Sequence, residues 1–181
     1  MRTEPVTSTK TEIPKKPAVS RASKISKKVW IKASPQTVYK ALTESKQLAR
    51  WFCDRASCDP REGKEFVACW KSGKNSREGR ALFTRVVPES ALELLWIDDG
   101  EGERPENAGH TLSYEIRSKS GMTELVMLDK DDAQTDEEAY QFLDQGWNSV
   151  LLELKDYCER VERTGKLHPP AKSRAQKASR D

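Results

Sequence analysis

The sequence contains few of the residues on which catalytic sites usually depend. Its 181 residues include two histidines, and one of them, His168, lies next to Pro169 and Pro170 near the C-terminus. There is no glycine-rich phosphate loop and no nucleophile elbow. A histidine-dependent nucleophile would need His110, and strand alternation points the nearby Ser113 the other way. We therefore expect no catalytic residue and no cofactor, and the alternative is an isolated acid or base in an apolar cavity.

Metal ligands and membrane-spanning segments are equally scarce. The four cysteines do not combine with the histidines in a zinc-binding spacing, and the acidic residues between 98 and 106 lack the glycine placement of a calcium loop. No stretch approaches the roughly 20 apolar residues that cross a bilayer, and the N-terminus lacks the apolar run of a signal peptide. We expect free thiols, no metal site, no membrane insertion and a cytoplasmic protein.

Charge divides the chain into an acidic body and two basic tails. Residues 1–28 carry a net charge of +6 and residues 164–181 a net charge of +4. Subtracting both from the overall +3 leaves −7 for residues 29–163. The tails hold almost no large apolar residue, which predicts disorder over 1–24 and 165–181 around one domain at 25–164. They also have no aromatic residue to stack on bases, which disfavours nucleic-acid binding as the main role.

One long amphipathic helix is the clearest feature that the sequence does contain. Thr135 and Glu138 have the spacing of a capping box, and Gly165 follows the last apolar position, which predicts a helix from about 137 to 163. Its length would be roughly 40 Å at about 1.5 Å per residue, so we expect it to lie across a sheet. Its apolar stripe consists of Leu143, Trp147, Val150, Leu154, Tyr157 and Val161, widened by Phe142, Leu151 and Cys158.

Alternating apolar residues predict that sheet. The expected antiparallel strands are 27–33, 64–70, 79–87, 91–98, 109–117 and 122–128. Between the first two, Ser34 and Pro35 have the pattern of a helix N-cap and first helical residue, and a second helical turn is expected around 44–50. Phase along the strand 27–33 leaves open whether Trp30 is a contact residue or is covered by a tail. The fold class is therefore α+β.

Three segments together resemble a known family. They are the run from Ala33 to Phe52, the strand from Gly79 that ends at Pro88, and the pair Gly146-Trp147. They resemble the helix-grip superfamily (START-like, SRPBCC or Bet v 1-like), and within it the domain named after the C-terminal part of the activator of the heat-shock-protein-90 ATPase. The resemblance covers about 25–164. It implies a curved antiparallel sheet of about six to seven strands around a long C-terminal helix, with two short helices after the first strand.

The resemblance also implies a ligand pocket between the sheet and the long helix. Its candidate residues are Phe66, Trp70, Phe83, Arg85, Trp96, Tyr114, Trp147, Leu151 and Leu154. Arg85 or Tyr114 could serve as the polar anchor, whereas the motif residues Trp51, Phe52, Gly146 and Trp147 are expected to be structural. We expect a non-catalytic protein that binds a small hydrophobic molecule. The alternatives are a co-chaperone-like module with a chaperone or other protein partner, a polyketide-cyclase-like enzyme, and an interior that the aromatic residues simply fill.

Overall fold

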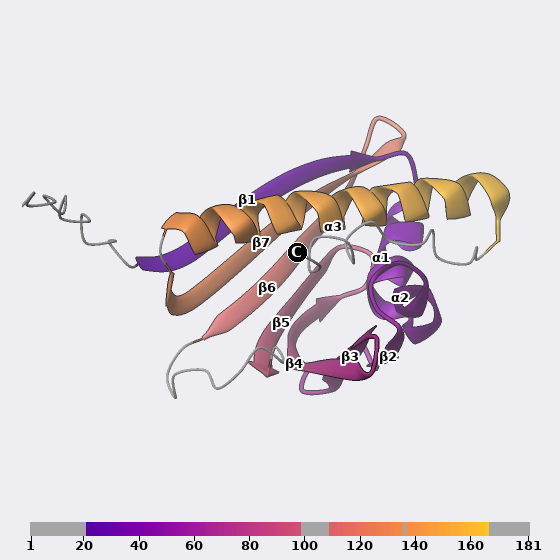
Figure 1. Cartoon of the computed structure of the whole chain (residues 1–181). Coiled ribbons are helices and arrows are strands. Elements are labelled where there is room, and N and C mark those ends of the chain that lie inside the picture. Colours follow the sequence, from indigo (N-terminus) through magenta and orange to yellow (C-terminus); the bar gives the residue numbers. More distant parts are fainter. Residues whose placement is uncertain (1–20, 99–108, 136, 167–181) are drawn as a thin grey trace, which may run out of the picture.

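The computed structural model describes residues 21–98, 109–135 and 137–166, which form three helices and a seven-stranded sheet (Figure 1). The elements follow in the order β1 (Arg21–Ile31), α1 (Pro35–Thr43), α2 (Ser45–Trp51), β2 (Arg55–Cys58), β3 (Glu65–Ser72), β4 (Asn75–Val87), β5 (Ala91–Asp98), β6 (His110–Lys119), β7 (Met122–Thr135) and α3 (Glu137–Thr164). This is the predicted α+β helix-grip fold. None of the helices in these ranges is both long and apolar enough to cross a bilayer.

The sheet is an antiparallel meander, closed on one side by the first strand. Its order is β1-β7-β6-β5-β4-β3-β2, so the two ends of the domain pair with each other through β1 and β7. Figure 1 shows α3 running along the sheet beside β1 and β7, with α1 and α2 packed at the far end next to β2. The helix and the sheet therefore enclose one concave face, and the other face of the sheet points away from all three helices.

Local sequence signals explain the short elements. The Ser34 side chain accepts a hydrogen bond from the backbone N–H of Thr37, and Pro35 opens α1, both as predicted. Ser120 and Gly121 both have positive φ, at 52° and 75°, and connect β6 directly to β7 as a two-residue hairpin turn.

Several strands differ from the prediction, since β4 begins at Asn75, four residues early, and β7 continues to Thr135, seven residues beyond its predicted end. β1 begins at Arg21, six residues before the predicted strand, because β7 is long enough to pair with it throughout. β2 was not predicted, since it has only four residues and none of them is a large apolar residue, although their burial alternates. The division into body and tails stays a prediction, because most tail residues lie outside the described ranges.

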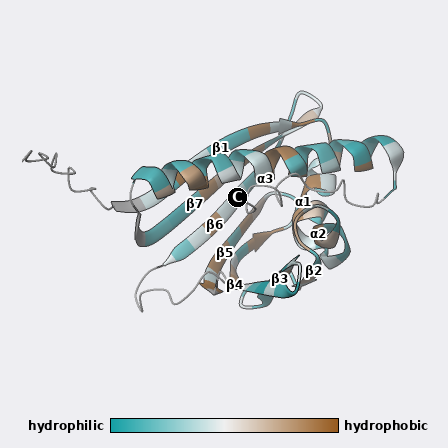
Figure 2. Cartoon of the chain, in the orientation of Figure 1, coloured by the Kyte–Doolittle hydropathy of each residue, from teal (hydrophilic) through white to brown (hydrophobic). Residues whose placement is uncertain are grey.

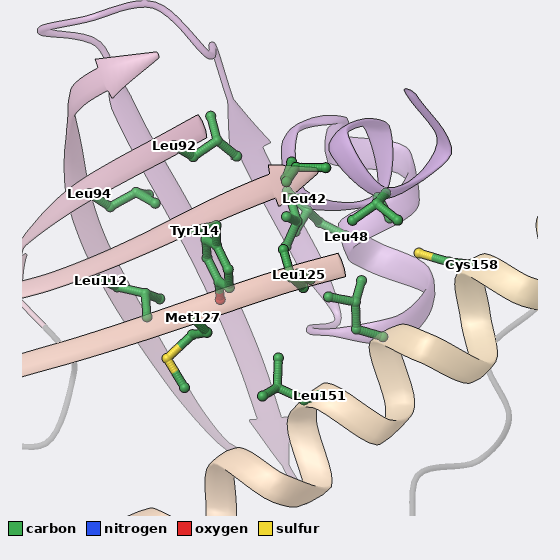
Figure 3. Close-up of a cluster of buried hydrophobic side chains, with 14 of the residues drawn as sticks. Leu42, Leu48, Leu92, Leu94, Leu112, Tyr114, Leu125, Met127, Leu151 and Cys158 are labelled. Carbon is green, nitrogen blue, oxygen red and sulfur yellow. The ribbon is translucent and has the colours of Figure 1, made fainter. Parts of the chain in front are cut away.

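The core lies between α3, α1 and the concave face. Figure 3 shows Tyr114 from β6, Leu125 and Met127 from β7 and Leu151 from α3 pointing toward one another. Leu125 and Met127 have no exposed surface, and Leu154 on the next turn of α3 has none either. The Tyr157 hydroxyl donates to the Gln47 side chain at 3.3 Å, which satisfies a polar pair in the core.

Helix α3 follows most of the predicted stripe. Its apolar residues interrupt an otherwise hydrophilic surface (Figure 2), and it ends before Gly165, whose φ is +63°. Leu151, Leu154, Tyr157 and Cys158 are buried, and Trp147, Val150 and Val161 are half-buried, whereas Leu143 is 37% exposed.

The prediction for Phe142 is wrong, because this side chain is 75% exposed. It lies nine residues, or about 2.5 turns, before Leu151 and therefore on the opposite side of the helix. The proposed cap at Thr135 involves a side chain outside the described part of the structure.

Side chains of α3 also bond to the outer edge of β1. Lys155 Nζ donates to the Trp30 carbonyl at 2.9 Å, Glu159 Oε1 accepts from the Lys32 N–H at 2.8 Å, and the Tyr140 hydroxyl lies 3.5 Å from the Lys24 carbonyl. The Trp30 ring itself is 36% exposed, with Lys119 Nζ 5.4 Å from its centroid. Among the described residues Trp30 thus lies at the surface beside Lys119, whereas the tails that were the alternative covering lie almost wholly outside them.

Candidate functional site

Aromatic side chains form a continuous wall on the concave face. Phe66 on β3 lies between Phe83 on β4 and Trp96 on β5, with ring centroids 6.4 and 5.9 Å away, both edge-on. Phe52, just after α2, continues the wall to Phe66 at 6.5 Å and to Trp70 at 5.3 Å. Phe66 and Phe83 are buried, whereas Trp70 and Trp96 are only half-buried. The wall therefore has buried phenylalanines at its base and two partly accessible indoles.

Gly79 on β4 makes room for the two indoles. An added Cβ at Gly79 would lie 2.9 Å from Cζ3 of Trp96 and 3.2 Å from Cζ3 of Trp70. Real Cβ atoms do not tolerate the shorter contact, so any other residue here would displace an indole. Glycine at position 79 thus has a packing reason.

A polar cluster lies at the β6 end of the wall. Asp129 on β7 is 5% exposed, and its two carboxylate oxygens contact different partners. Oδ1 lies 2.9 Å from His110 Nε2, and Oδ2 accepts a hydrogen bond from Trp147 Nε1 at 2.5 Å. The His110 ring in turn stacks on Trp96, with centroids 6.1 Å apart and planes 22° apart. The carboxylate therefore fixes the orientation of an imidazole and an indole at the concave face.

The two-residue turn between β6 and β7 sets the register that forms this cluster. Lys119 pairs with Met122, so Leu112 pairs with Asp129, and His110 lies diagonally across from it. Alternation then points His110, Leu112 and Asp129 to the same side of the sheet.

Tyr114 places a further polar group beside the cluster. Its side chain is 7% exposed, and in Figure 3 it extends from β6 past Met127 on the side of α3. Burial, and secondly the negative charge of Asp129, raise the pKa of Tyr114, so its hydroxyl stays protonated. The hydroxyl forms no hydrogen bond with any other described residue. It is thus a neutral donor without a protein partner in this part of the chain.

The residues of this site lie within a segment that matches a known protein family. The sequence model of the family described as Activator of Hsp90 ATPase homolog 1-like protein matches residues 32–159, which include the wall, Asp129 and Trp147. The chain belongs to this family. The resemblance drawn from Ala33–Phe52 and Gly146-Trp147 is confirmed. No curated protein matches the chain.

Solved structures of Activator of Hsp90 ATPase homolog 1-like and related proteins share the helix-grip fold. The Aha1 dimer from Colwellia psychrerythraea is 21% identical, with a TM-score of 0.61 over 80% of this chain and 98% of that chain. MLL2253 from Mesorhizobium loti is 17% identical, with a TM-score of 0.64 over 76% of this chain and 98% of that chain. DynU16, a putative protein in the dynemicin biosynthetic locus, is 21% identical, with a TM-score of 0.62 over 80% of this chain and 48% of that chain. At these identities the likeness shows the fold alone.

The family fold brings most of the predicted pocket residues to one face. Phe66, Phe83, Trp96, Tyr114, Leu151 and Leu154 belong to the concave side or the core beneath it, with Trp70 and Trp147 half-buried at its margins. Asp129 and His110 were not proposed as site residues. Their signal was an acidic residue in phase with Leu125 and Met127, and a histidine in phase with Leu112.

Arg85 is not in the site, and its assignment as a pocket residue is wrong. The strand pairing shifts between Phe83 and Arg85, which pair with Leu94 and Glu93, so Thr84 is an extra residue in a β-bulge. One extra residue reverses the alternation, and Arg85 is exposed instead of in phase with Phe83. Of the two residues predicted as a possible polar anchor, Tyr114 lies on the concave side and Arg85 does not.

The motif residues have separate roles. Trp51 Nε1 donates to the Ala41 carbonyl at 2.9 Å and joins α2 to α1, which supports its structural assignment. Its ring lies 5.3 Å from that of Phe52. Packing does not require a glycine at position 146, because an added Cβ there would meet nothing within 4 Å.

Cysteine and metal chemistry receive little support from the described residues. Burial raises the pKa of Cys53 to about 11 and that of Cys58 and Cys158 to about 12, so these free thiols stay protonated. Within the described ranges, no group of three histidine, cysteine or acidic side chains is placed to hold a metal ion. The acidic segment weighed as a calcium site and His168 lie almost wholly outside those ranges.

Proposed function

We propose that this protein binds a small, mostly apolar molecule between the aromatic wall and α3, without catalysing a reaction. The half-buried state of Trp70, Trp96 and Trp147 carries the proposal. These three residues keep part of their surface accessible at the margin of the concave face, where a planar apolar molecule could pack on the indoles. Membership of the family supports a START-like binding domain in general.

Tyr114 supplies the polar contact in this proposal. The Tyr114 hydroxyl keeps some accessible surface although the residue is only 7% exposed, so a bound molecule can reach it. The Asp129 carboxylate already accepts from Trp147 and contacts His110, so its role is to hold these two rings in place. We therefore expect a ligand with a planar apolar body and at least one hydrogen-bonding group that reaches the Tyr114 hydroxyl.

Titration with N-phenyl-1-naphthylamine, an uncharged fluorescent probe of apolar sites, tests the proposal. The full-length protein should raise probe fluorescence saturably, and Gly79→Ala should weaken binding by about tenfold or more, because its methyl group displaces Trp96 or Trp70. Gly146→Ala is the matched control, since its methyl group meets no neighbour. Native mass spectrometry of the protein from its own cells should show a stoichiometric apolar compound. Equal probe binding by both glycine variants would contradict the site.

A co-chaperone-like role is the second candidate, and the opposite face of the sheet favours it. Leu82 on β4 pairs with Leu95 on β5, both half-buried, and Ile97 next to them is 52% exposed. A row of partly exposed apolar side chains is a feature of protein contacts. Ile97→Lys should then reduce stimulation of the Hsp90 ATPase while leaving probe binding at the concave face unchanged. If the wild-type protein does not stimulate that ATPase, this candidate fails and the first one is untouched.

A further inference from the structure

A cavity lies outside the grip, on the surface between α1 and the β4–β5 turn. Its volume is about 510 Å³, and it also touches the start of α2 and the end of β2. Tyr39 provides an aromatic side chain, and Pro60, Pro88 and Cys58 provide apolar surface around it. None of the aromatic-wall residues lines it. The groove is therefore separate from the site proposed above.

Two hydrogen bonds fix the walls of the groove. Gln36 Nε2 on α1 donates to Glu89 Oε1 in the β4–β5 turn at 3.1 Å, and the Cys58 N–H donates to Ser45 Oγ at 3.0 Å. Glu89 has a φ of 58°, a left-handed conformation that usually favours glycine. The strained residue is held by the turn bond from the Ser90 N–H to the Val87 carbonyl at 3.0 Å. The groove is thus preformed, which lowers the entropic cost of binding an extended segment.

An aromatic ring between two prolines suits a proline-containing peptide. Such peptides adopt the polyproline II conformation with little loss of entropy and pack their rings against aromatic side chains. The sequence contains one Pro-Pro pair, Pro169-Pro170, followed by Lys172 and Arg174. The groove lining carries Glu44 and Glu89 but also Lys40 and Lys46, so local charge is balanced. Because β1 belongs to the folded domain, the domain at residues 21–166 carries a net charge of −2, opposite in sign to the +3 of residues 167–181.

The end of α3 lies within reach of the groove. Glu162 Oε2 accepts hydrogen bonds from Thr37 and, at 3.2 Å, from Ser34, so the last turn of α3 is joined to the first turn of α1. The two helical steps from Glu162 to Thr164 and the five further steps to Pro169 together span at most about 20 Å. Helix α1 has nine residues and is about 14 Å long. The Pro-Pro pair can therefore reach any position along α1, including Tyr39 and Thr43.

We propose that the groove binds residues 167–172 of the same chain, with Pro169 and Pro170 packed on Tyr39 and between Pro60 and Pro88. The groove would then be a docking site for a basic, proline-containing peptide, occupied in the resting protein by its own C-terminal segment. Binding at the concave face does not depend on this contact.

NMR relaxation of the full-length protein tests the docking. In the wild type, the amides of Ala171 and Lys172 should have transverse relaxation rates close to those of α1. Tyr39→Ala, and independently the double variant Pro169→Ala and Pro170→Ala, should lower those rates by about twofold or more, because the segment then moves freely on the nanosecond scale. The proline variants alter no residue of the folded domain. Tyr140→Ala is the matched control for loss of a half-exposed tyrosine.

The possible results of this experiment distinguish docking of the same chain's C-terminal segment from docking of a second copy's segment. Slow tail amides that both variants release, independent of protein concentration, support the intramolecular contact. Amides that are already fast in the wild type, or that respond equally to Tyr140→Ala, overturn it. Release on dilution would also overturn it, since the segment would then come from a second copy. Binding of N-phenyl-1-naphthylamine should be the same in all these variants except Tyr140→Ala, so failure here is distinguishable from failure of the concave-face site.

Discussion

The two halves of α3 are attached to the domain in different ways. From Leu151 onward, the helix buries Leu154, Tyr157 and Cys158 without any exposed surface. Before Leu151 its attachments are mainly polar: Trp147 bonds to Asp129, and Asp144 to Lys27 at 2.6 Å. Apolar burial resists separation in proportion to the area removed from water, whereas exposed ion pairs contribute little. The half of α3 beside the polar cluster is therefore the less strongly held, which is consistent with the proposal that a ligand enters beneath it.

Leu154→Ala should have the largest effect of the changes that follow from this comparison. Its side chain is fully buried, so the loss of transfer energy and the cavity left behind should lower the free energy of unfolding by about 2–5 kcal/mol. Leu152→Ala is the matched control, because Leu152 is 57% exposed and its loss should cost less than about 0.5 kcal/mol. Urea denaturation measures both. Equal losses would mean that the C-terminal half is not held by burial.

Trp147→Phe should destabilise the protein less, by about 1–3 kcal/mol, because it leaves a buried Asp129 oxygen without its donor. Trp96→Phe is the control, since the Trp96 ring packs on His110 and Gly79 and its N–H bonds to none of the described residues. Unfolding curves of both variants should show the larger loss for Trp147→Phe. Equal losses for the two variants would mean that the Trp147–Asp129 hydrogen bond does not help to hold the N-terminal half of α3.

Two glutamates of α3 should respond to pH with opposite sign. Hydrogen bonds from Thr37, and then from Ser34, hold the pKa of Glu162 below its ordinary 4.5. Its stabilisation is present above pH 4.5 and is lost as pH falls through the lowered pKa. Burial raises the pKa of Glu153 above 4.5, so its contribution is favourable at low pH and is lost as pH rises through the raised value.

Stability measured from pH 3 to 7 should therefore separate these residues. Glu162→Gln should be less stable than the wild type at pH 7, with the difference shrinking below about pH 4.5. Glu153→Gln should be more stable than the wild type at pH 7, and that difference should also shrink on acidification. Parallel pH profiles for both variants and the wild type would show that folding shifts the pKa of neither carboxyl group.

Phe142→Ala should have the smallest effect, within about 0.5 kcal/mol of the wild type, because the ring is 75% exposed. Thermal unfolding gives the value. A loss comparable to that of Leu154→Ala would place Phe142 in an apolar contact and remove the contrast between the two halves of α3.

Most of the fold could be predicted from the chain itself. The α3 stripe, the Ser34–Pro35 start of α1 and six of the seven strands follow from periodicity and capping. The exceptions have physical reasons. β2 is only four residues long and is a strand because it pairs with β3. The bulge at Thr84 reverses the side of the sheet on which Arg85 lies, and no glycine in the sequence marks its position. A single inserted residue in a ladder is a tertiary effect that alternation does not show.

The candidate site was only half predictable. The aromatic wall follows from strand phase, because Phe66, Phe83 and Trp96 all alternate with outward residues. The proximity of His110 and Asp129 follows from the two-residue turn at Ser120, had the register been counted from it. The bond from Trp147 to Asp129 could not be predicted in this way, since it depends on where α3 lies across the sheet.

The bonds from α3 to the margin of β1 have a consequence for association between molecules. An 11-residue outer strand ordinarily offers its free backbone groups as a template on which another chain can add a strand. Here Lys155, Glu159 and Tyr140 occupy backbone groups along that margin, and the strand at the opposite margin has only four residues. The same helix that forms the grip thus guards the sheet against intermolecular strand addition and the fibrils that grow from it.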